Sequence, residues 1–568
     1  MKRIITILAV LAVSLPFVSC NQDLLEIPQK GVITIDNFYQ NDEDAENALV
    51  AMYESFASNM MTTDYPAGNY IPWYAIFNVC GDDFLAAGKQ YGSSDFYAEM
   101  NEFRYDSQNT IVDLVYTRYY KMIYNANLII DNFKDGTSET MKRCVAEARV
   151  LRAYCHMMLA IGWGAAPLAD HVLGANEALS NYEGGQKGLL EWAGKECEEA
   201  VANLTERTST TDKDATVKFT KGVAWAVAGK AYLFAGNYSK ARENLKKVID
   251  SGKYALVPGE RWAENFHQSG DGNEEKILEV NFVMTDAKSR YQLEGRSKWQ
   301  MLQSFCWRTD RLATARIPWI GVRSGWGCCA IQQDFAQEFL DNDGDSYRRK
   351  ATFLTPEEFL YDMEWYAGSN DLTLDEKKTD AKRGIIHADG LYGNGRYIWL
   401  KTMPLKEDVD HPAGAFGFTN TLIMRYAEVL LMYAEVAAVD GDSDGLGLKC
   451  LNDVQKRAGA PVSATLTLDA VKKEKSYELW LEGCRWADQI RWGDTERLKK
   501  QGANIPSVKD AFFTPETGDQ TEPEHRLYVT YSNPNGEGYS KFEDKHKLFP
   551  YPYSAIKANP NLKQNPGW

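Results

Sequence analysis

The sequence lacks the motifs that identify the common classes of enzyme. It has no GxSxG, no HExxH and no Gly-rich phosphate loop, and no pair of cysteines has CxxC spacing. Histidine is scarce, with 7 residues in a chain of 568, and none is clustered with cysteines or carboxylates. These absences argue against hydrolytic, zinc-dependent and nucleotide-dependent chemistry, so we expect no catalysis and no cofactor.

An excess of positive charge is also missing. The formal net charge is −16 and the pI is about 5.1, which argues against nucleic acid and anionic membrane surfaces as partners. Aromatic residues are abundant instead, with 15 Trp and 31 Tyr. Most should pack in a core, but such a surplus also suits a surface on which the flat faces of a sugar or peptide can stack.

Long hydrophobic runs are absent beyond the start of the chain. Ile4–Val13 is apolar, follows two basic residues and is too short to span a bilayer, which predicts an export signal at residues 1–19. A small residue then precedes Cys20, as in lipoproteins. We predict that Cys20 carries a lipid that attaches the mature chain to a membrane. The alternative is ordinary secretion with Cys20 unmodified.

Helical periodicity dominates the rest of the chain. Ile111–Phe133 and Glu139–Trp163 each predict a long helix. Lys221–Ile249 matches a tetratricopeptide (TPR) unit, and Asn420–Arg457 repeats the pattern. Because one repeat cannot bury its apolar face alone, several should stack. The predicted fold is therefore mostly α, with about four antiparallel TPR-like hairpins. They are expected at residues 111–163, 187–250, 421–458 and 469–491.

Two sections lack this periodicity. Residues 62–104 are rich in Gly, Asp, Tyr and Trp and are predicted to form long surface loops, which often carry function. Residues 261–411 are predicted to form a large irregular insertion. Within it, Lys276–Val283 and Arg396–Leu400 alternate as short β-strands do.

The stretch Glu474–Gly493, EKSYELWLEGCRWADQIRWG, is predicted to form one helix, because its apolar residues recur on one helical face. Charged residues lie among the apolar ones at the spacing of helical neighbours, and a buried charge must be paired. We interpret the stretch as a structural helix whose charges pair along its length. Those residues are Glu478, Glu482, Arg485, Asp488 and Arg491.

The same stretch resembles the C-terminal signature of the SusD/RagB family, which are nutrient-binding lipoproteins of the Bacteroidetes outer membrane. The chain also resembles that family in EAR-x-x-RAY at 147–154, in RYAEVLL at 425–431 and in its closing residues, FPYP to QNPGW. It departs from the family pattern at Lys475 and Gln455, where Arg is usual. The matching signature residues are Glu474, Glu478, Leu479, Glu482, Gly483, Arg485, Asp488, Arg491, Trp492 and Gly493.

The resemblance implies a domain organisation for the chain. After the lipoprotein signal peptide at 1–19, residues 20–260 would form an N-terminal SusD-like helical region that carries the loops at 62–104. Residues 261–568 would form the C-terminal region, with the irregular section at 261–411 followed by a helical section and tail at 412–568.

The resemblance also implies a binding surface, because the glycan binders of this family use an aromatic face drawn from the N-terminal loops and the irregular section. Aromatic rings stack on sugar rings, and polar side chains bind the hydroxyl groups. The predicted ligand contacts are Asp83, Lys89, Tyr91 and Phe96 from the loops, and Trp299, Trp307, Trp319 and Trp326 from the irregular section.

The implied function is therefore non-catalytic. A lipid-anchored receptor, exposed at the surface of the outer membrane, would bind oligosaccharide or polysaccharide and pass it to a TonB-dependent, SusC-like transporter. One alternative is a RagB-type scaffold that binds a peptide or protein. Another is a surface glycosidase that uses Asp82 and Asp83, although adjacent carboxylates seldom converge on one bond.

One acidic turn resembles part of a metal site. Asp440, Asp442 and Asp444, followed by Gly445, imitate the first half of an EF-hand loop. Leu451 occupies the twelfth position, where a bidentate Glu belongs. We favour a solvated turn between two helices, and a weak structural calcium site is the alternative.

Overall fold

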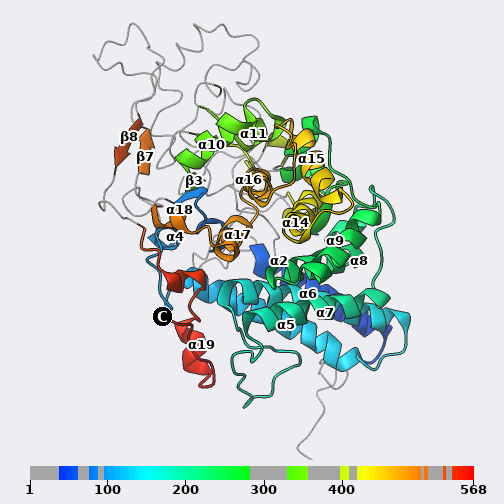
Figure 1. The fold of residues 1–568 in the computed structure, drawn as a ribbon. Helices are drawn as coiled ribbons and strands as arrows, with labels where there is room; N and C mark the ends of the chain where they lie inside the picture. Colours follow the sequence, from blue (N-terminus) through cyan, green and yellow to red (C-terminus); the bar gives the residue numbers. More distant parts are fainter. Residues whose placement is uncertain are drawn as a thin grey trace, which may run out of the picture.

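The computed structural model describes the helical parts of the chain almost continuously (Figure 1). The described residues are 38–61, 76–86, 95–281, 329–355, 358, 397–403, 405–408, 419–500, 505–508, 529–532 and 540–568. Cys20, Lys89, Tyr91, Trp299, Trp307, Trp319 and Trp326 lie outside them. Phe96 lies inside a helix, but its side chain is not described.

Helices make up most of the described chain, which confirms the predicted fold class. In chain order the α-helices are α2 (Asp42–Met61), α4 (Asp95–Asn101), α5 (Thr110–Phe133), α6 (Glu139–Trp163), α7 (Gly185–Ala200), α8 (Lys221–Phe234), α9 (Tyr238–Asp250), α10 (Gln333–Asp343), α11 (Tyr347–Thr352), α14 (Tyr426–Asp440), α15 (Leu446–Ala458), α16 (Leu468–Glu478), α17 (Arg485–Trp492), α18 (Glu496–Lys500) and α19 (Tyr553–Ala558). The 3₁₀ helices are η3 (Val201–Asn203), η4 (Asp214–Val217), η5 (Gly259–Phe266), η6 (Gln268–Gly270), η12 (Lys406–Asp408) and η13 (Asp544–Lys547).

The strands are short and pair two by two, always antiparallel. They are β1 (Phe84–Ala86) with β3 (Cys329–Ile331), β2 (Lys276–Val280) with β6 (Thr421–Arg425), β4 (Phe353–Leu354) with β5 (Ile398–Trp399), and β7 (Ile505–Val508) with β8 (Val529–Ser532). The two runs predicted as strands in the irregular section are confirmed by β2 and β5. The β1–β3 and β2–β6 pairs each join a strand of the irregular section to a distant part of the chain, so they connect that section to the rest of the fold.

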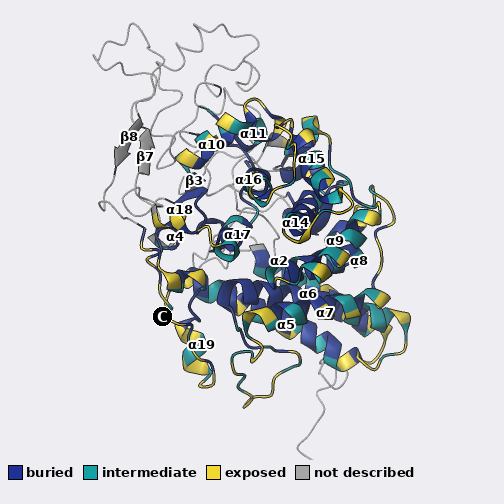
Figure 2. Cartoon of the chain, in the orientation of Figure 1, coloured by how far each residue is buried: buried dark blue, intermediate teal, exposed yellow. Residues whose placement is uncertain are grey.

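The helices stack in sequence order from α5 to α9 and continue through α14 to α15 and α16 (Figure 1). Their facing sides are buried and their outer sides are exposed (Figure 2). The two long helices predicted at 111–163 are confirmed by α5 and α6. Asn109 begins α5 by accepting a hydrogen bond from the backbone N–H of Ile111 at 2.9 Å, and α6 ends at Gly164, whose φ is 75°.

The α8–α9 hairpin has the predicted TPR-like form. Gly236 has φ 74° in the turn, and the side chain of Asn237 accepts a hydrogen bond from the N–H of Lys240 at 3.3 Å to begin α9. The two helices approach closely at Gly229, where an added Cβ would collide with the side chain of Leu245. A small residue at this position therefore allows the helices to pack.

The stretch 474–493 is not one helix, so that prediction was wrong. α16 ends at Glu478 and α17 begins at Arg485. In the turn between them, Leu481 and Gly483 have φ 69° and 76°, which is left-handed backbone that does not continue a helix.

Side chains from distant parts of the chain stabilise this turn. Arg425 donates a hydrogen bond to the carbonyl oxygen of Glu478 at 2.7 Å, and Lys401 donates one to that of Trp480 at 2.6 Å. Side chains thereby satisfy carbonyl groups at the helix end, and the turn buries Trp480 completely. Periodicity within the stretch carries no information about these donors.

The expectation of loops across residues 62–104 was wrong for the part that the structure describes. Residues 76–86 are buried and contain β1, and residues 95–101 form α4. The ring of Phe77 packs against those of Trp486 and Phe549, which lie in α17 and the C-terminal tail. This contact with distant apolar residues removes from solvent a segment whose composition resembles a loop.

Candidate ligand-binding site

The β1–β3 pair joins the two sections that carry the predicted ligand contacts. Phe84 pairs with Ile331 and Ala86 pairs with Cys329, which places the last residue of β1 opposite the first residue of β3. The chain leaves β1 toward Lys89 and Tyr91, and it enters β3 from the Trp-rich section. The described structure therefore brings the attachment points of the two sections together.

Asp83 is the predicted contact whose side chain the structure describes. Only 3% of the residue is exposed, and its carbonyl oxygen accepts hydrogen bonds from the indole of Trp480 at 3.1 Å and from the N–H of Gln332 at 3.0 Å. A sugar hydroxyl cannot reach a carboxyl group buried in this way. The position of Asp83 therefore argues against direct ligand contact and indicates a structural role at the base of β1.

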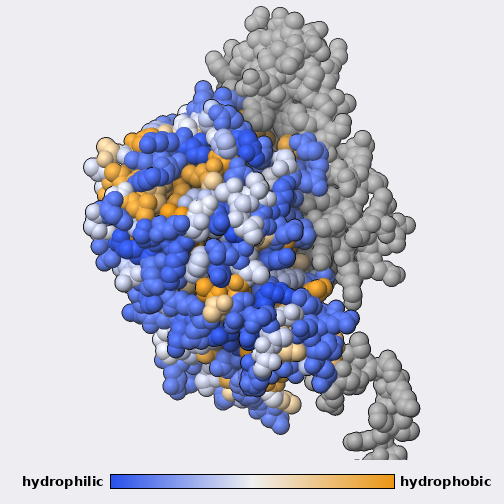
Figure 3. All heavy atoms as spheres, turned by 90° about the vertical axis from the view of Figure 1, so that its right-hand side faces the viewer, coloured by the Kyte–Doolittle hydropathy of each residue, from blue (hydrophilic) through white to orange (hydrophobic). Residues whose placement is uncertain are grey.

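Tryptophan is not exposed on the described part of the scaffold. Trp163, Trp262, Trp399, Trp480 and Trp486 are buried, and Trp192, Trp225, Trp492 and Trp568 are partly buried. Figure 3 shows a face on which hydrophilic residues predominate, with a hydrophobic patch at the upper left and smaller ones toward the centre and below. The exposed large hydrophobic residues of the described chain are Val50, Tyr124, Leu173, Tyr347, Val439, Val462 and Tyr553. No tryptophan of the described scaffold is therefore more than partly exposed.

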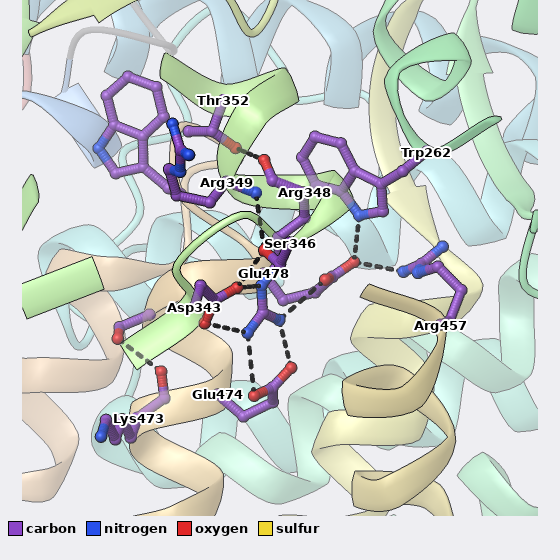
Figure 4. Close-up of polar contacts among 12 residues, drawn as sticks. Trp262, Asp343, Ser346, Arg348, Arg349, Thr352, Arg457, Lys473, Glu474 and Glu478 are labelled. Atoms are coloured by element: carbon purple, nitrogen blue, oxygen red, sulfur yellow. Dashed lines mark hydrogen bonds and ion pairs between the residues drawn. The ribbon is translucent and has the colours of Figure 1, made fainter. Parts of the chain in front are cut away.

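The structure contains a buried network of charged side chains that the sequence analysis missed, and Figure 4 shows the part of it around Arg348 and Glu478. Arg348 binds Asp343 at 2.8 Å and also contacts Glu474 and Glu478. Arg425 binds Glu478 at 2.6 Å. Arg425 also binds Glu275 at 2.7 Å and Glu482 at 2.8 Å, Arg457 binds Glu275 and Glu478, and Lys401 binds Glu482 at 2.7 Å.

Glu478 is the centre of this network. Its carboxylate contacts Arg348, Arg425 and Arg457 and accepts a hydrogen bond from the indole of Trp262 at 3.1 Å. Burial alone would raise the pKa of Glu478, but the three guanidinium groups outweigh it and hold that pKa well below its usual range. A carboxylate held ionised by three arginines is a poor proton donor or acceptor near neutral pH, so the network is structural.

The pairing expected along the 474–493 stretch is largely wrong. Asp488 and Arg491 do pair, at 2.7 Å. Arg485 instead binds Asp82 at 2.7 Å, and the partners of Glu478 and Glu482 lie outside the stretch. The interpretation that the stretch is ion-paired and structural is confirmed, although most partners are distant.

A second charged cluster surrounds a small cavity among α6, α8, α14 and α17. The cavity measures about 10 Å³, room for about one water molecule. Lys230 and Glu428 pair beside it at 2.8 Å, as do Lys475 and Asp488 at 2.7 Å. The cavity is too small for a sugar, so it is not a candidate for the ligand site.

The carboxylates of the acidic turn at 440–445 accept hydrogen bonds from nearby backbone N–H groups. Asp442 accepts from the N–H groups of Gly447 at 2.7 Å and Leu448 at 2.9 Å, which begins α15, and Asp444 accepts from that of Leu446 at 3.2 Å. Over the described ranges no cluster of three His, Cys, Asp or Glu residues is arranged to hold a metal ion. The geometry favours the reading as a turn between helices.

The glycosidase alternative depends on Asp82 and Asp83. Both are buried, and Arg485 and Arg497 bind the carboxylate of Asp82. The pair therefore lacks the access that a glycoside substrate requires. No helix in the described portion of the chain is long and apolar enough to cross a bilayer.

Fold and site together define a class of protein: a stacked helical scaffold whose irregular sections are anchored side by side. Comparison with known sequences identifies the family. The profile described as "SusD family" matches residues 316–568, and the profile described as "Starch-binding associating with outer membrane" matches residues 38–233. The chain belongs to the SusD-like family.

Individual relatives are similar along most of their length. The chain is 24% identical to the "Starch-binding protein SusD" of Bacteroides thetaiotaomicron, over 81% of this chain and 79% of the relative. It is 22% identical to a "SusD-like protein" of Bacteroides ovatus, over 86% of this chain and 82% of the relative. The curated relatives are described as SusD-like or starch-binding proteins, which agrees with a non-enzymatic role.

Solved structures share the fold. A "Laminarin binding SusD-like protein" has a TM-score of 0.70 and 21% identity, covering 93% of this chain and 100% of the other. "Surface glycan-binding protein A from Bacteroides thetaiotaomicron in complex with laminarihexaose" has a TM-score of 0.70 and 20% identity, with the same coverage. At this level of identity the likeness establishes the fold alone.

Proposed function

We propose that this protein binds oligosaccharide without transforming it. Relatives described as starch-binding or laminarin-binding support the ligand class. The carboxylates that the described structure buries, most of them paired with arginine or lysine, support the absence of hydrolysis, since general acid catalysis needs an accessible carboxylic acid.

The observation that carries the proposal is the β1–β3 pair. It ties the chain that leads to Lys89 and Tyr91 to the end of the section that contains Trp319 and Trp326. Because no described tryptophan is more than partly exposed, the tryptophans that we propose for stacking are those of the irregular section, beside Tyr91 and Phe96 of the loops. We propose that the ligand binds beside this strand pair.

The proposed setting is the cell surface. We propose that Cys20 carries a lipid, that the protein is attached to the outer membrane, and that bound sugar passes to a TonB-dependent, SusC-like transporter. A family profile that associates its members with the outer membrane supports this location. Replacing Cys20 with Ser should move the protein from the membrane fraction to the soluble fraction, and an unchanged distribution would refute the anchor.

Isothermal titration with laminarihexaose and with maltoheptaose tests the ligand class. Trp319→Ala and Trp326→Ala should each weaken binding about fivefold or more, because loss of one aromatic contact costs about 1 kcal/mol. Tyr124→Ala, an exposed aromatic on α5, is the matched control and should leave affinity unchanged. Binding of a peptide library but of neither sugar would favour the RagB-type scaffold instead.

A further inference from the structure

The base of β1 contains a charged cluster that the proposed function does not use. Arg485 from α17 binds the carboxylate of Asp82 through two hydrogen bonds, at 2.7 and 3.0 Å. Arg497 from α18 binds the same carboxylate at 2.8 Å and also binds Glu338 of α10 at 2.7 Å. Two guanidinium groups thus face two carboxylates, and the charges balance without any contribution from Asp83.

Asp83 lies against this balanced cluster. An added Cβ at Gly81 would collide with the carboxyl oxygen of Asp83, so the side chain folds back over the turn that begins the strand. The residue is 3% exposed. An ionised Asp83 would therefore be an excess negative charge, buried next to that of Asp82. Burial first, and the Asp82 carboxylate second, raise the pKa of Asp83 to about 7, against the opposing effect of Arg485 and Arg497.

The same turn is fixed by contacts from several neighbouring elements. The carbonyl of Asp83 accepts from Trp480 and Gln332, and the N–H of Asp82 donates to Gln489 at 3.3 Å. The side-chain amide of Asn101 donates to the carbonyl oxygen of Phe84 at 3.0 Å. These groups are neutral. The charged groups that face Asp83 are Asp82, Arg485 and Arg497, with Glu338 acting through Arg497.

We propose that the carboxyl group of Asp83 is a proton-dependent switch for the anchor of the β1–β3 pair, by which we mean the turn at residues 81–83 that begins β1. When it is neutral, Arg485 and Arg497 hold the turn through Asp82 alone. When it is ionised, the unbalanced charge favours opening of residues 81–86 and weakens their pairing with β3. The effect on the strand pair stands alone, whereas any effect on sugar binding rests on the proposed function.

The direction in which pH changes the stability of this anchor follows from proton linkage. The closed anchor keeps the proton of Asp83 up to about pH 7, whereas an opened turn loses it near the ordinary aspartate value of about 4. The anchor is therefore tightest in acid, and it loosens as the pH rises from about 4 to about 7. The opening equilibrium should increase on the order of tenfold to a hundredfold between pH 5 and pH 7.5.

Amide hydrogen exchange without sugar tests the switch. Peptides that cover 81–86 and 329–332 should exchange faster at pH 7.5 than at pH 5, after correction for the intrinsic rate, relative to peptides from α8. Asp83→Asn, which is neutral at every pH, should abolish this difference. The same pH response in wild type and in Asp83→Asn would overturn the proposal.

A second variant keeps the test decisive if Asp83→Asn does not fold. Glu338→Gln removes a half-exposed carboxylate and leaves Arg497 with Asp82 alone, so the added positive potential should shift the exchange transition to lower pH. A shift to higher pH would contradict the switch.

Laminarihexaose affinity at the two pH values is measured separately. Loss of binding at both would refute the proposed function and leave the exchange result to decide the anchor.

Discussion

Two helical pairs of this protein are stabilised in different ways. In α8–α9 the facing residues are apolar and small, such as Gly229 and Leu245, and charged pairs such as Lys246–Asp250 lie on the exposed side. In α16–α17 the charges are inside, and most of their partners come from other elements of the chain. A pair of the first kind is encoded by its own sequence, whereas a pair of the second kind depends on the rest of the fold.

Removing one arginine from the buried network should lower the free energy of unfolding more than any other change proposed below. Arg425→Ala leaves Glu275, Glu478 and Glu482 with fewer positive partners in a site that water does not reach. Breaking a buried ion pair on one side typically costs about 3–5 kcal/mol. Urea unfolding at pH 7, followed by circular dichroism, measures the loss. A change below about 1 kcal/mol would mean that water or neighbouring groups compensate, and that the two helical pairs do not differ as argued.

Prediction from the sequence succeeded for α8–α9, whose packing is encoded locally, and failed for α16–α17, whose partners are distant. α5, α6, α8 and α9 were predicted correctly because apolar spacing, capping residues and a Gly–Asn turn are local signals. The break after Glu478 was missed because Lys401 and Arg425, which bind the carbonyl groups there, lie more than 50 residues away. Asn78 also contacts this turn, because its side-chain oxygen accepts a hydrogen bond from the N–H of Gly483 at 2.8 Å.

The site shows the same limit. Composition gave a loop for 76–86, but pairing with β3 and packing against α17 bury it, so Asp83 lies away from solvent. Phe96 lies in α4 with its side chain not described, and the other predicted contacts and Cys20 lie outside the described residues, so all of them stay predictions, as does the domain division after residue 260. The local sequence does not indicate the partner of Asp82, because Arg485 is 403 positions away.

A core truncation in the locally encoded pair should have the next largest effect. Leu245→Ala removes a fully buried side chain that packs on Gly229, and such changes cost about 2–4 kcal/mol. Its matched control is Lys246→Ala, which removes only an exposed pair and should change stability by a few tenths of a kcal/mol. Equal losses in the two variants would show that α9 is not held by its apolar face.

Acid should weaken the charged pair more than the apolar one. Lys475 and Arg491 overcome the effect of burial and lower the pKa of Glu435 to about 2. Its stabilising contribution is therefore complete above about pH 4.5 and is lost as the pH falls toward 2. Urea midpoints at pH 5, 4 and 3 should fall in the wild type and fall less steeply in Glu435→Gln. Parallel curves for the two proteins would contradict this assignment; Glu243→Gln on α9 is the exposed control.

The smallest stability changes are expected in the α14–α15 turn, because its carboxylates accept only local hydrogen bonds. Asp442→Ala removes the acceptor for two N–H groups at the start of α15 and should cost about 1 kcal/mol, the usual value of a helix cap. Asp444→Ala loses one longer bond and should cost less. Both losses should be the same in calcium and in EDTA, because the carboxylates bind backbone groups. A calcium-dependent rise in Tm that Asp442→Ala abolishes would instead establish a metal site at this turn, since a ligand that binds only the folded state raises its stability.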